Sequence, residues 1–270
     1  MNGRRLALAT FFCAMPFSAD ARTICILVAD PTDGRVIVEK GDCRKRVTPA
    51  STFKLALAVM GYDAGFLVDA DSPVIDFRAG DPDWGGKEWT RPATPRRWLR
   101  YSVVWYSQRI AEALGSDRLS GYARRFRYGN ADFSGDPGKD NGLERAWISS
   151  SLTISPVEQA EFLSAFVNRS LPIAPRVFDQ VDAIVETTPA PGGWLVRGKT
   201  GSAFPRKADG KLDRSRGYGW YVGWVQKGDR RAVVVRLDQD EKREAVSGGL
   251  RARAALISEL PDLLGEAGLD

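Results

Sequence analysis

Short runs of apolar residues bounded by polar turn segments predict β-strands at both ends of the chain. Near the amino end, residues 25–29 and 35–38 are rich in Ile, Val and Leu, and the Asp33-Gly34 pair between them is a strong hairpin signal. Three further strand-like runs, rich in aromatic and β-branched residues, lie toward the carboxyl end at residues 194–199, 218–224 and 232–237. A sheet assembled from the two chain ends is therefore expected.

Between these strands the apolar residues recur at helical spacing. We expect a helix over residues 98–114, with Gly115 as its C-cap. Another helix should begin at Ser155, because Pro156 follows it and Glu158 can complete a capping box. Two segments rich in Asp, Gly and Pro, residues 71–95 and 131–144, are predicted loops.

The closing segment has an amphipathic helical pattern that we expect to end at Pro261, since proline breaks helix interiors. Strands at both ends around a helical middle indicate the α+β class. We expect a single domain over residues 22–270, with an antiparallel sheet flanked by helices. Its sheet lobe would comprise about residues 22–63 and 189–270, and its helical lobe about residues 64–188.

The first 21 residues have the pattern of a secretory signal peptide. Arg4 and Arg5 precede an apolar stretch, and Ala19-Asp20-Ala21 forms a small-residue cleavage site. The apolar stretch is short for a membrane span, and no other segment approaches the required length. We therefore expect an exported, periplasmic protein that keeps no membrane span after cleavage.

Export permits a disulfide between two of the three cysteines. In the register of the predicted hairpin, Cys25 and Cys43 lie near each other at its open end. We expect them to be bonded.

The composition excludes several kinds of catalytic site, because the chain contains no histidine. Ser-His-Asp and Cys-His catalysis and histidine metal sites are absent, which leaves Lys, Asp, Glu or Tyr as bases. Three scattered cysteines are too few for a zinc site, so no metal is expected. The net charge of +5 comes from dispersed residues, which argues against nucleic-acid binding and favours a small anionic substrate.

Residues 53–60 are apolar apart from Lys54, which predicts a helix buried on all sides. Thr48 suits the N-cap and Pro49 the first helical position, so Ser51 should lie in the first turn. Ser51 and Lys54 are three residues apart and share a helix face, where a desolvated lysine amine can act as a base. Taken alone, S-x-x-K is more often a solvated helix edge.

Lys199-Thr200-Gly201 follows the first of the late strands. It is either a plain strand end or a site where a hydroxyl and a cation hold a substrate carboxylate while glycine lets a ligand approach. S-x-x-K followed by K-T-G is typical of serine acyl-transferases that recognise penicillin.

With its other motifs, the chain resembles the class D β-lactamases, or oxacillinases, over nearly all of the mature sequence. The resemblance rests on six motifs in the family's order: Ser51-Thr52-Phe53-Lys54, Ser102-Val103-Val104, Tyr128-Gly129-Asn130, Trp147 ahead of Ile154-Ser155, Lys199-Thr200-Gly201 and Trp220-Tyr221-Val222-Gly223. It implies a β-lactamase/transpeptidase-like fold. One departure is Ser202-Ala203 after K-T-G, where many relatives carry an aromatic or another side chain.

The resemblance also implies roles for individual residues. Ser51 would be the acylated nucleophile and Lys54 the general base, carbamylated by carbon dioxide to N6-carboxylysine, with no dissociable cofactor. Ser102 would pass a proton to the leaving ring nitrogen, with electrostatic support from Lys199. The indole N–H of Trp147 would hold the carbamate.

The same resemblance assigns the substrate contacts. Backbone N–H groups of Ser51 and Ser202 would form the oxyanion hole, and Val104 and Ile148 would line the pocket. Thr200 and Gly201 would contact the β-lactam. The expected carboxylate anchor is Arg251, with Arg253 as the alternative, because cations at a helix start make sense where an anion docks.

β-Lactam antibiotics are thus the expected substrates. Two other interpretations share the motifs: a penicillin-binding DD-peptidase, and the sensor domain of a β-lactam receptor. Both are acylated but deacylate slowly, so rapid turnover of a penicillin separates them from a β-lactamase.

Overall fold

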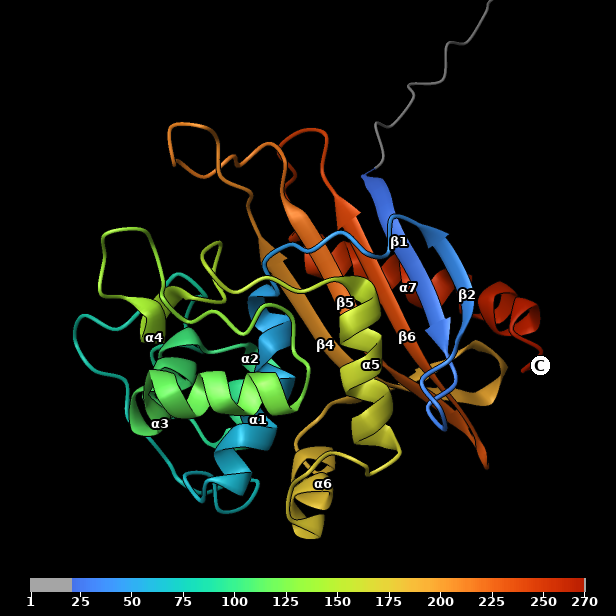
Figure 1. Ribbon diagram of the computed structural model, residues 1–270, viewed down its shortest axis with the longest axis horizontal. Coiled ribbons are helices and arrows are strands. Elements are labelled where there is room, and N and C mark those ends of the chain that lie inside the picture. Colours follow the sequence, from blue (N-terminus) through green and yellow to red (C-terminus); the bar gives the residue numbers. More distant parts are fainter. Residues whose placement is uncertain (1–20, 270) are drawn as a thin grey trace, which may run out of the picture.

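A computed structural model describes residues 21–269, so all of the expected signal peptide except Ala21 lies outside the described residues. The chain has the expected α+β fold, with a six-stranded antiparallel sheet in the order β2-β1-β6-β5-β4-β3. The strands are β1 (Arg22–Ala29), β2 (Val36–Gly41), β3 (Thr187–Ala190), β4 (Trp194–Ala203), β5 (Tyr218–Lys227) and β6 (Arg230–Gln239). As predicted, the sheet joins both chain ends, because β1 pairs with β6 (Figure 1).

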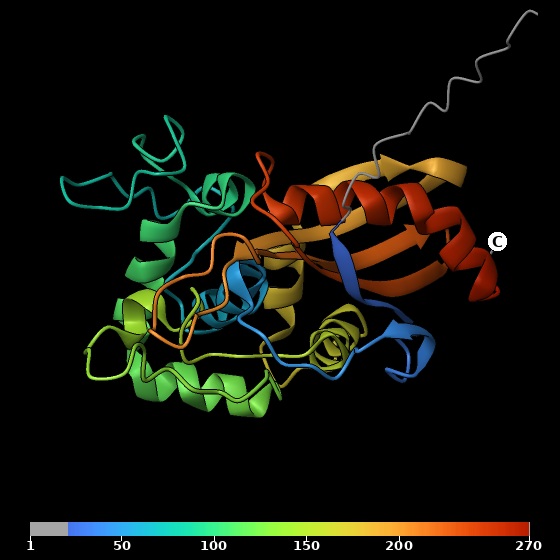
Figure 2. The ribbon, with the colours of Figure 1, turned by 90° about the horizontal axis from the view of Figure 1, so that it is seen from above.

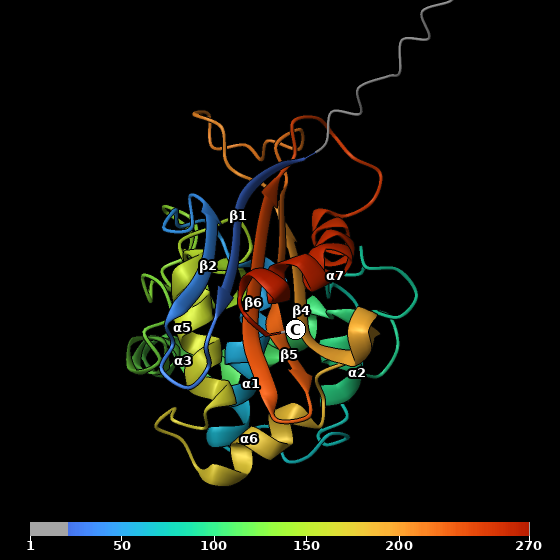
Figure 3. The same cartoon turned by 90° about the vertical axis from the view of Figure 1, so that its right-hand side faces the viewer.

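The central strands β5 and β6 are almost continuously buried because helices cover both faces of the sheet. Helix α7 (Gly248–Glu266) lies along one face, and α5 (Pro156–Val167) packs on the other against β1, β5 and β6 (Figures 2 and 3). Besides the main core on the α5 face of the sheet, a smaller core lies under α7. It contains Leu256, Leu260, Leu264, Val225 and Val234. The predicted strands are confirmed. The short β3 was missed, and Pro189 suits such a strand only because it lies at the sheet edge.

The predicted disulfide is confirmed: the Cys25 and Cys43 sulfurs lie 2.01 Å apart. The hairpin register pairs Cys25 with Gly41, two residues before Cys43. The bond therefore closes the open end of the β1–β2 hairpin.

The helical part of the chain packs on the β4 side of the sheet (Figure 1). A 3₁₀ turn, η1 (Ala50–Thr52), leads into the buried helix α1 (Phe53–Asp63). Around α1 lie α2 (Pro95–Tyr101), α3 (Val104–Arg125), α4 (Gly142–Arg145) and α6 (Pro175–Asp182). The capping box of α5 is confirmed: the Ser155 hydroxyl accepts from the Glu158 N–H, and the Glu158 carboxylate accepts from the Ser155 N–H.

Of three local predictions about helices, two were wrong. The helix expected over residues 98–114 is two helices, because Ser102 takes a left-handed conformation (φ 60°) between α2 and α3. The expected stop at Gly115 is borne out: its backbone leaves the helical conformation (φ 76°, ψ 162°), and a second helical stretch of α3 follows after the kink. Helix α7 runs through Pro261 with a bend visible in Figure 2, since Leu260, Leu263 and Leu264 keep both halves buried on the sheet.

Among residues 21–269, no helix is long and apolar enough to cross a membrane. Within the same range, no group of His, Cys, Asp or Glu side chains is arranged to hold a metal ion.

Candidate active site

Ser51 lies in the η1 turn immediately before α1. Thr48 is not the helix N-cap that we expected: its hydroxyl donates to the Trp147 carbonyl (2.9 Å) and accepts from the Ser149 N–H (3.0 Å). Its carbonyl accepts from the Trp220 indole N–H (3.0 Å). Thr48 thus ties the approach to Ser51 to the turn that carries Trp147.

The Lys54 ammonium position is 3.4 Å from the Ser51 hydroxyl, which it contacts from the first turn of α1. The Lys54 side chain is completely buried. Burial, followed by the nearby positive charge of Lys199, lowers the pKa of Lys54 well below its usual value. This shift favours the neutral amine, the form that a base or a carbamylation site needs.

Ser102 terminates α2 in a left-handed conformation that is uncommon for a residue other than glycine. Its hydroxyl is buried and has no hydrogen-bond partner among the described residues. The preceding carbonyl, that of Tyr101, accepts from the Trp89 indole N–H (2.8 Å), and the Trp89 carbonyl accepts from Trp105 (2.7 Å). Loop residue Trp89 therefore supports the strained position of Ser102.

Lys199 and Thr200 lie where the edge of β4 is open, because β3 pairs only with Trp194–Arg197. The buried Lys199 ammonium donates to the Thr200 carbonyl (3.3 Å) and hydroxyl (3.4 Å), neither of which carries a negative charge. Burial lowers the pKa of Lys199 to about 8; Glu186 opposes this shift and Arg253 adds to it. Lys199 is thus held at the strand edge with no ion-pair partner among the described residues.

Gly201 lets β4 touch the turn of the expected nucleophile. A Cβ at Gly201 would lie 2.9 Å from the Pro49 carbonyl oxygen, which is closer than real Cβ contacts allow. It would also lie 3.0 Å from the Thr52 methyl group, which is at the limit of such contacts. The Ser202 hydroxyl, one residue further, accepts from the Gly249 N–H at the start of α7 (2.9 Å). K-T-G followed by serine therefore fastens β4 between η1 and α7.

Trp147 is completely buried, with its ring 5.3 Å from that of Phe53 and its indole N–H without a partner among residues 21–269. Burying an unpaired N–H is costly, so this donor is available for a group at the site. Val104 is buried and Ile148 is half-buried against the same core.

The structure does not bring Arg251 to Lys199 and Thr200. Its guanidinium pairs with Asp240 and donates to the Val246 carbonyl (3.1 Å). Arg253 lies instead in a small pocket with Lys199 and Thr200, and it donates to the Thr188 hydroxyl. Residues two apart on a helix point in nearly opposite directions, so only one of the two arginines can face the β4 edge.

This arrangement has close counterparts among known proteins. A family model described as the penicillin-binding protein transpeptidase domain matches residues 24–261. Beta-lactamase OXA-9 of Klebsiella pneumoniae is 41% identical over 244 residues, which cover 89% of this chain and 88% of the relative. The chain belongs to the class D β-lactamases. Beta-lactamase OXA-1 of Escherichia coli is 34% identical, over 88% of this chain and 84% of the relative.

The solved structure of the class D β-lactamase OXA-427 is 46% identical to this chain and superimposes with a TM-score of 0.84, covering 90% of this chain and 99% of the other. This class D β-lactamase is therefore a hydrolase that acts on the β-lactam amide bond. The enzyme also contains site features that sequence reasoning missed. The support of Ser102 by Trp89 and the hydroxyl bridge of Thr48 have no sequence signal, because both depend on residues that only the fold brings together.

Proposed function

We propose that this class D β-lactamase opens the β-lactam ring of its substrate by forming an acyl-enzyme on Ser51. Lys54, in the form of N6-carboxylysine, would be the general base. One observation carries the proposal. The completely buried Lys54 amine lies 3.4 Å from the Ser51 hydroxyl, in the same core as a Trp147 indole N–H that has no partner among the described residues.

The residues present fit a carbamate at Lys54. The neutral amine can add to the carbon of carbon dioxide, forming an N–C bond and releasing one proton. The product is an anion, which a buried site tolerates only with a donor, and Trp147 has an indole N–H that does not titrate. Val104 and Ile148 belong to the same apolar core as Phe53 and Trp147, and apolar surroundings favour the neutral amine. When bound, the carbamate supplies an oxygen base for the serine proton and for the hydrolytic water.

In acylation, the Ser51 oxygen forms a bond to the β-lactam carbonyl carbon and the amide C–N bond breaks. Ser102 carries the proton to the departing ring nitrogen; its buried hydroxyl has no competing partner among residues 21–269. The positive charge of Lys199 would make a neighbouring hydroxyl a better proton donor. Water then cleaves the ester and regenerates the Ser51 hydroxyl.

The backbone N–H groups of Ser51 and Ser202 would stabilise the oxyanion. Loss of one such donor typically costs about 3 kcal/mol of transition-state stabilisation. The hydrogen bond from Gly249 to the Ser202 hydroxyl and the contact of Gly201 with η1 support this alignment of β4 with Ser51.

The substrate carboxylate would dock against Thr200, Lys199 and Arg253. This assignment replaces Arg251, which pairs with Asp240. Gly201 leaves room for the ligand at the strand edge. Periplasmic export remains part of the proposal, supported by the Cys25–Cys43 disulfide, since disulfides persist in oxidising compartments.

A sensor function is the second candidate, because Regulatory protein BlaR1 of Bacillus licheniformis is 26% identical over 83% of this chain. The chain spans 34% of that protein's length, whereas it spans 88% of the OXA-9 enzyme. Steady-state turnover of a penicillin, compared with persistence of a stoichiometric acyl-enzyme, separates the two functions. Two results together would refute the carbamate: absence of a carbamate carbon signal with ¹³C-bicarbonate, and full turnover by Lys54→Ala.

A further inference from the structure

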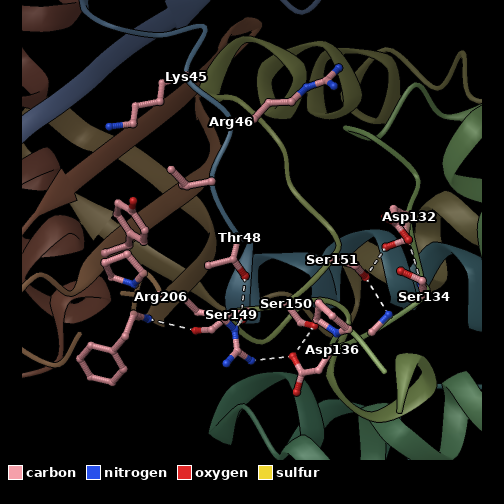
Figure 4. A pocket seen from close by; sticks show the side chains of 16 residues that line it. Lys45, Arg46, Thr48, Asp132, Ser134, Asp136, Ser149, Ser150, Ser151 and Arg206 are labelled. Atoms are coloured by element: carbon pink, nitrogen blue, oxygen red, sulfur yellow. Dashed lines mark hydrogen bonds and ion pairs between the residues drawn. The ribbon is translucent and has the colours of Figure 1, made fainter. Parts of the chain in front are cut away.

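A cavity of about 540 Å³ lies beside the turn that carries Trp147 (Figure 4). Four segments and Tyr218 form its wall: residues 45–48 on the approach to Ser51, residues 132–137, residues 149–151, and residues 204–206 after β4. Figure 4 shows Ser149, Ser150, Asp136 and Arg206 together at one side of this cavity.

The Arg206 guanidinium connects these segments through three hydrogen bonds. Its Nε donates to the Ser149 carbonyl (2.8 Å), one Nη donates to Asp136 (2.5 Å) and the other to the Gly210 carbonyl (2.6 Å). Asp136 also accepts from the Ser150 hydroxyl (2.6 Å). A planar guanidinium with several donors is suited to such a bridge, and a lysine could not make all three bonds in this geometry.

The bridge acts on a strained turn. Ser149 has a left-handed backbone (φ 56°), and its hydroxyl accepts from the Phe204 N–H (3.1 Å). Its N–H donates to Thr48, which also holds the Trp147 carbonyl. Every polar group of Ser149 is thus used to fix the turn two residues after Trp147, and two of those bonds come from the segment that follows Ser202 and Ala203.

The charges agree with this arrangement. Burial would raise the pKa of Asp136, but hydrogen bonds from Ser150 and Asn141 and the charges of Arg206 and Arg145 hold the pKa of this carboxyl below its usual value. Asp136 is therefore an anion at neutral pH, and its pairing with Arg206 persists over the working pH range.

We propose that Arg206 is a positioning residue that clasps the Trp147–Ser151 turn to the end of β4, and so holds the Trp147 indole N–H in place for the carbamate on Lys54. The inference rests on the proposed function. Arg206 touches neither Ser51 nor substrate in this assignment; it acts through Ser149 and the Trp147 backbone. Loosening the clasp should weaken carbamylation and leave substrate binding at Thr200 largely unchanged.

The experiment compares the wild type with Arg206→Ala, Arg206→Lys and Lys207→Ala. Lys207→Ala is the matched control, because this substitution removes a positive charge from the same loop. The exposed Lys207 side chain has no hydrogen bond or ion pair within residues 21–269. Each protein is titrated with ¹³C-bicarbonate, and the carbamate carbon signal gives the half-saturating concentration. KM and kcat for a penicillin are then measured with and without added bicarbonate.

We expect Arg206→Ala to need roughly tenfold more bicarbonate, as is typical when a supporting partner of a bound group is lost. Its kcat should fall without added bicarbonate and recover with it, while KM stays within about twofold of the wild type. Arg206→Lys should lie between, because it keeps the charge facing Asp136, and Lys207→Ala should match the wild type.

Two results would overturn the inference. An Arg206→Ala half-saturation equal to that of the wild type would do so even if kcat fell, because the loss would then be structural. The wild-type titration tests the proposed function separately: no carbamate signal there would remove the carbamate, and this inference with it.

Discussion

Raising the pH should weaken substrate capture by neutralising Lys199. Burial lowers the pKa of this lysine to about 8 in the free enzyme. About half of the molecules then carry a neutral Lys199 at pH 8, and about nine-tenths at pH 9. A penicillin carboxylate is anionic throughout this range, so the cation that should meet it disappears while the anion remains.

The magnitude follows from this titration. If only the protonated form captures substrate efficiently, kcat/KM should fall about tenfold for each pH unit well above 8, because kcat/KM reports the free enzyme. Once bound, the substrate carboxylate places a negative charge beside the ammonium and raises its pKa. The alkaline fall in kcat should therefore begin at a higher pH than the fall in kcat/KM.

The assay is penicillin hydrolysis from pH 6.5 to 10 with bicarbonate kept saturating. Lys199→Arg serves as the control, since a guanidinium keeps its proton over this range and should remove the alkaline fall. A kcat/KM that stays level to pH 9.5 in the wild type would refute the reasoning. The same alkaline fall in Lys199→Arg would also refute it. If the arginine variant is inactive, the test is the wild type alone, where kcat and kcat/KM falling at the same pH would refute the reasoning.

Three further outcomes are expected. Replacing Cys25 and Cys43 by alanine should lower the free energy of unfolding by about 3 kcal/mol in denaturant titrations, since the bond spans 18 residues; a loss under about 1 kcal/mol would contradict the entropic account. Trp147→Phe keeps an aromatic ring in the core but removes the N–H, so it should raise the ¹³C-bicarbonate half-saturation roughly tenfold; no change would exclude the indole as donor. Arg253→Ala should raise KM for penicillins roughly tenfold while Arg251→Ala leaves KM unchanged; the reverse pattern would restore the original assignment.

The parts of the fold that the sequence predicts well are those with local causes. The capping box at the start of α5 needs only Ser155, Pro156 and Glu158, and these residues form it in the structure. The β1–β2 hairpin likewise follows from Asp33-Gly34 between two apolar runs. The disulfide could be predicted because the same register sets the separation of its cysteines.

The break at Ser102 has a non-local cause. No glycine or proline marks it, and the apolar spacing continues because α2 and α3 bury their faces in one core. The left-handed turn is held from outside, by Trp89 on the loop before α2. A residue held in a strained conformation by tertiary contacts has no signature in its own segment.

The position of Arg251 away from Lys199 depends on the phase of α7. Two glycines set that phase: a Cβ at Gly249 would lie 2.7 Å from the Gly201 carbonyl oxygen, and one at Gly248 would lie 2.9 Å from the Gly219 Cα. Their close approach fixes how α7 begins against β4 and β5. As a result, Arg253 faces the edge of β4 and Arg251 faces Asp240. Which arginine faces β4 therefore depends on contacts between segments that are distant in the sequence, such as Gly249 with Gly201.

Several residues of the candidate site depart from the ordinary rules for a stable core. Lys54 and Lys199 are buried amines without an anionic partner among residues 21–269, and the Ser102 hydroxyl and Trp147 indole N–H are buried without any partner there. Buried polar groups are normally paired, so a core shaped for stability alone would have replaced all four. They lie on four separate segments, and two of them are close to the nucleophile's turn: Lys54 contacts Ser51, and the Trp147 ring packs on Phe53. The proposed carbamate and substrate would complete the hydrogen bonds of these groups.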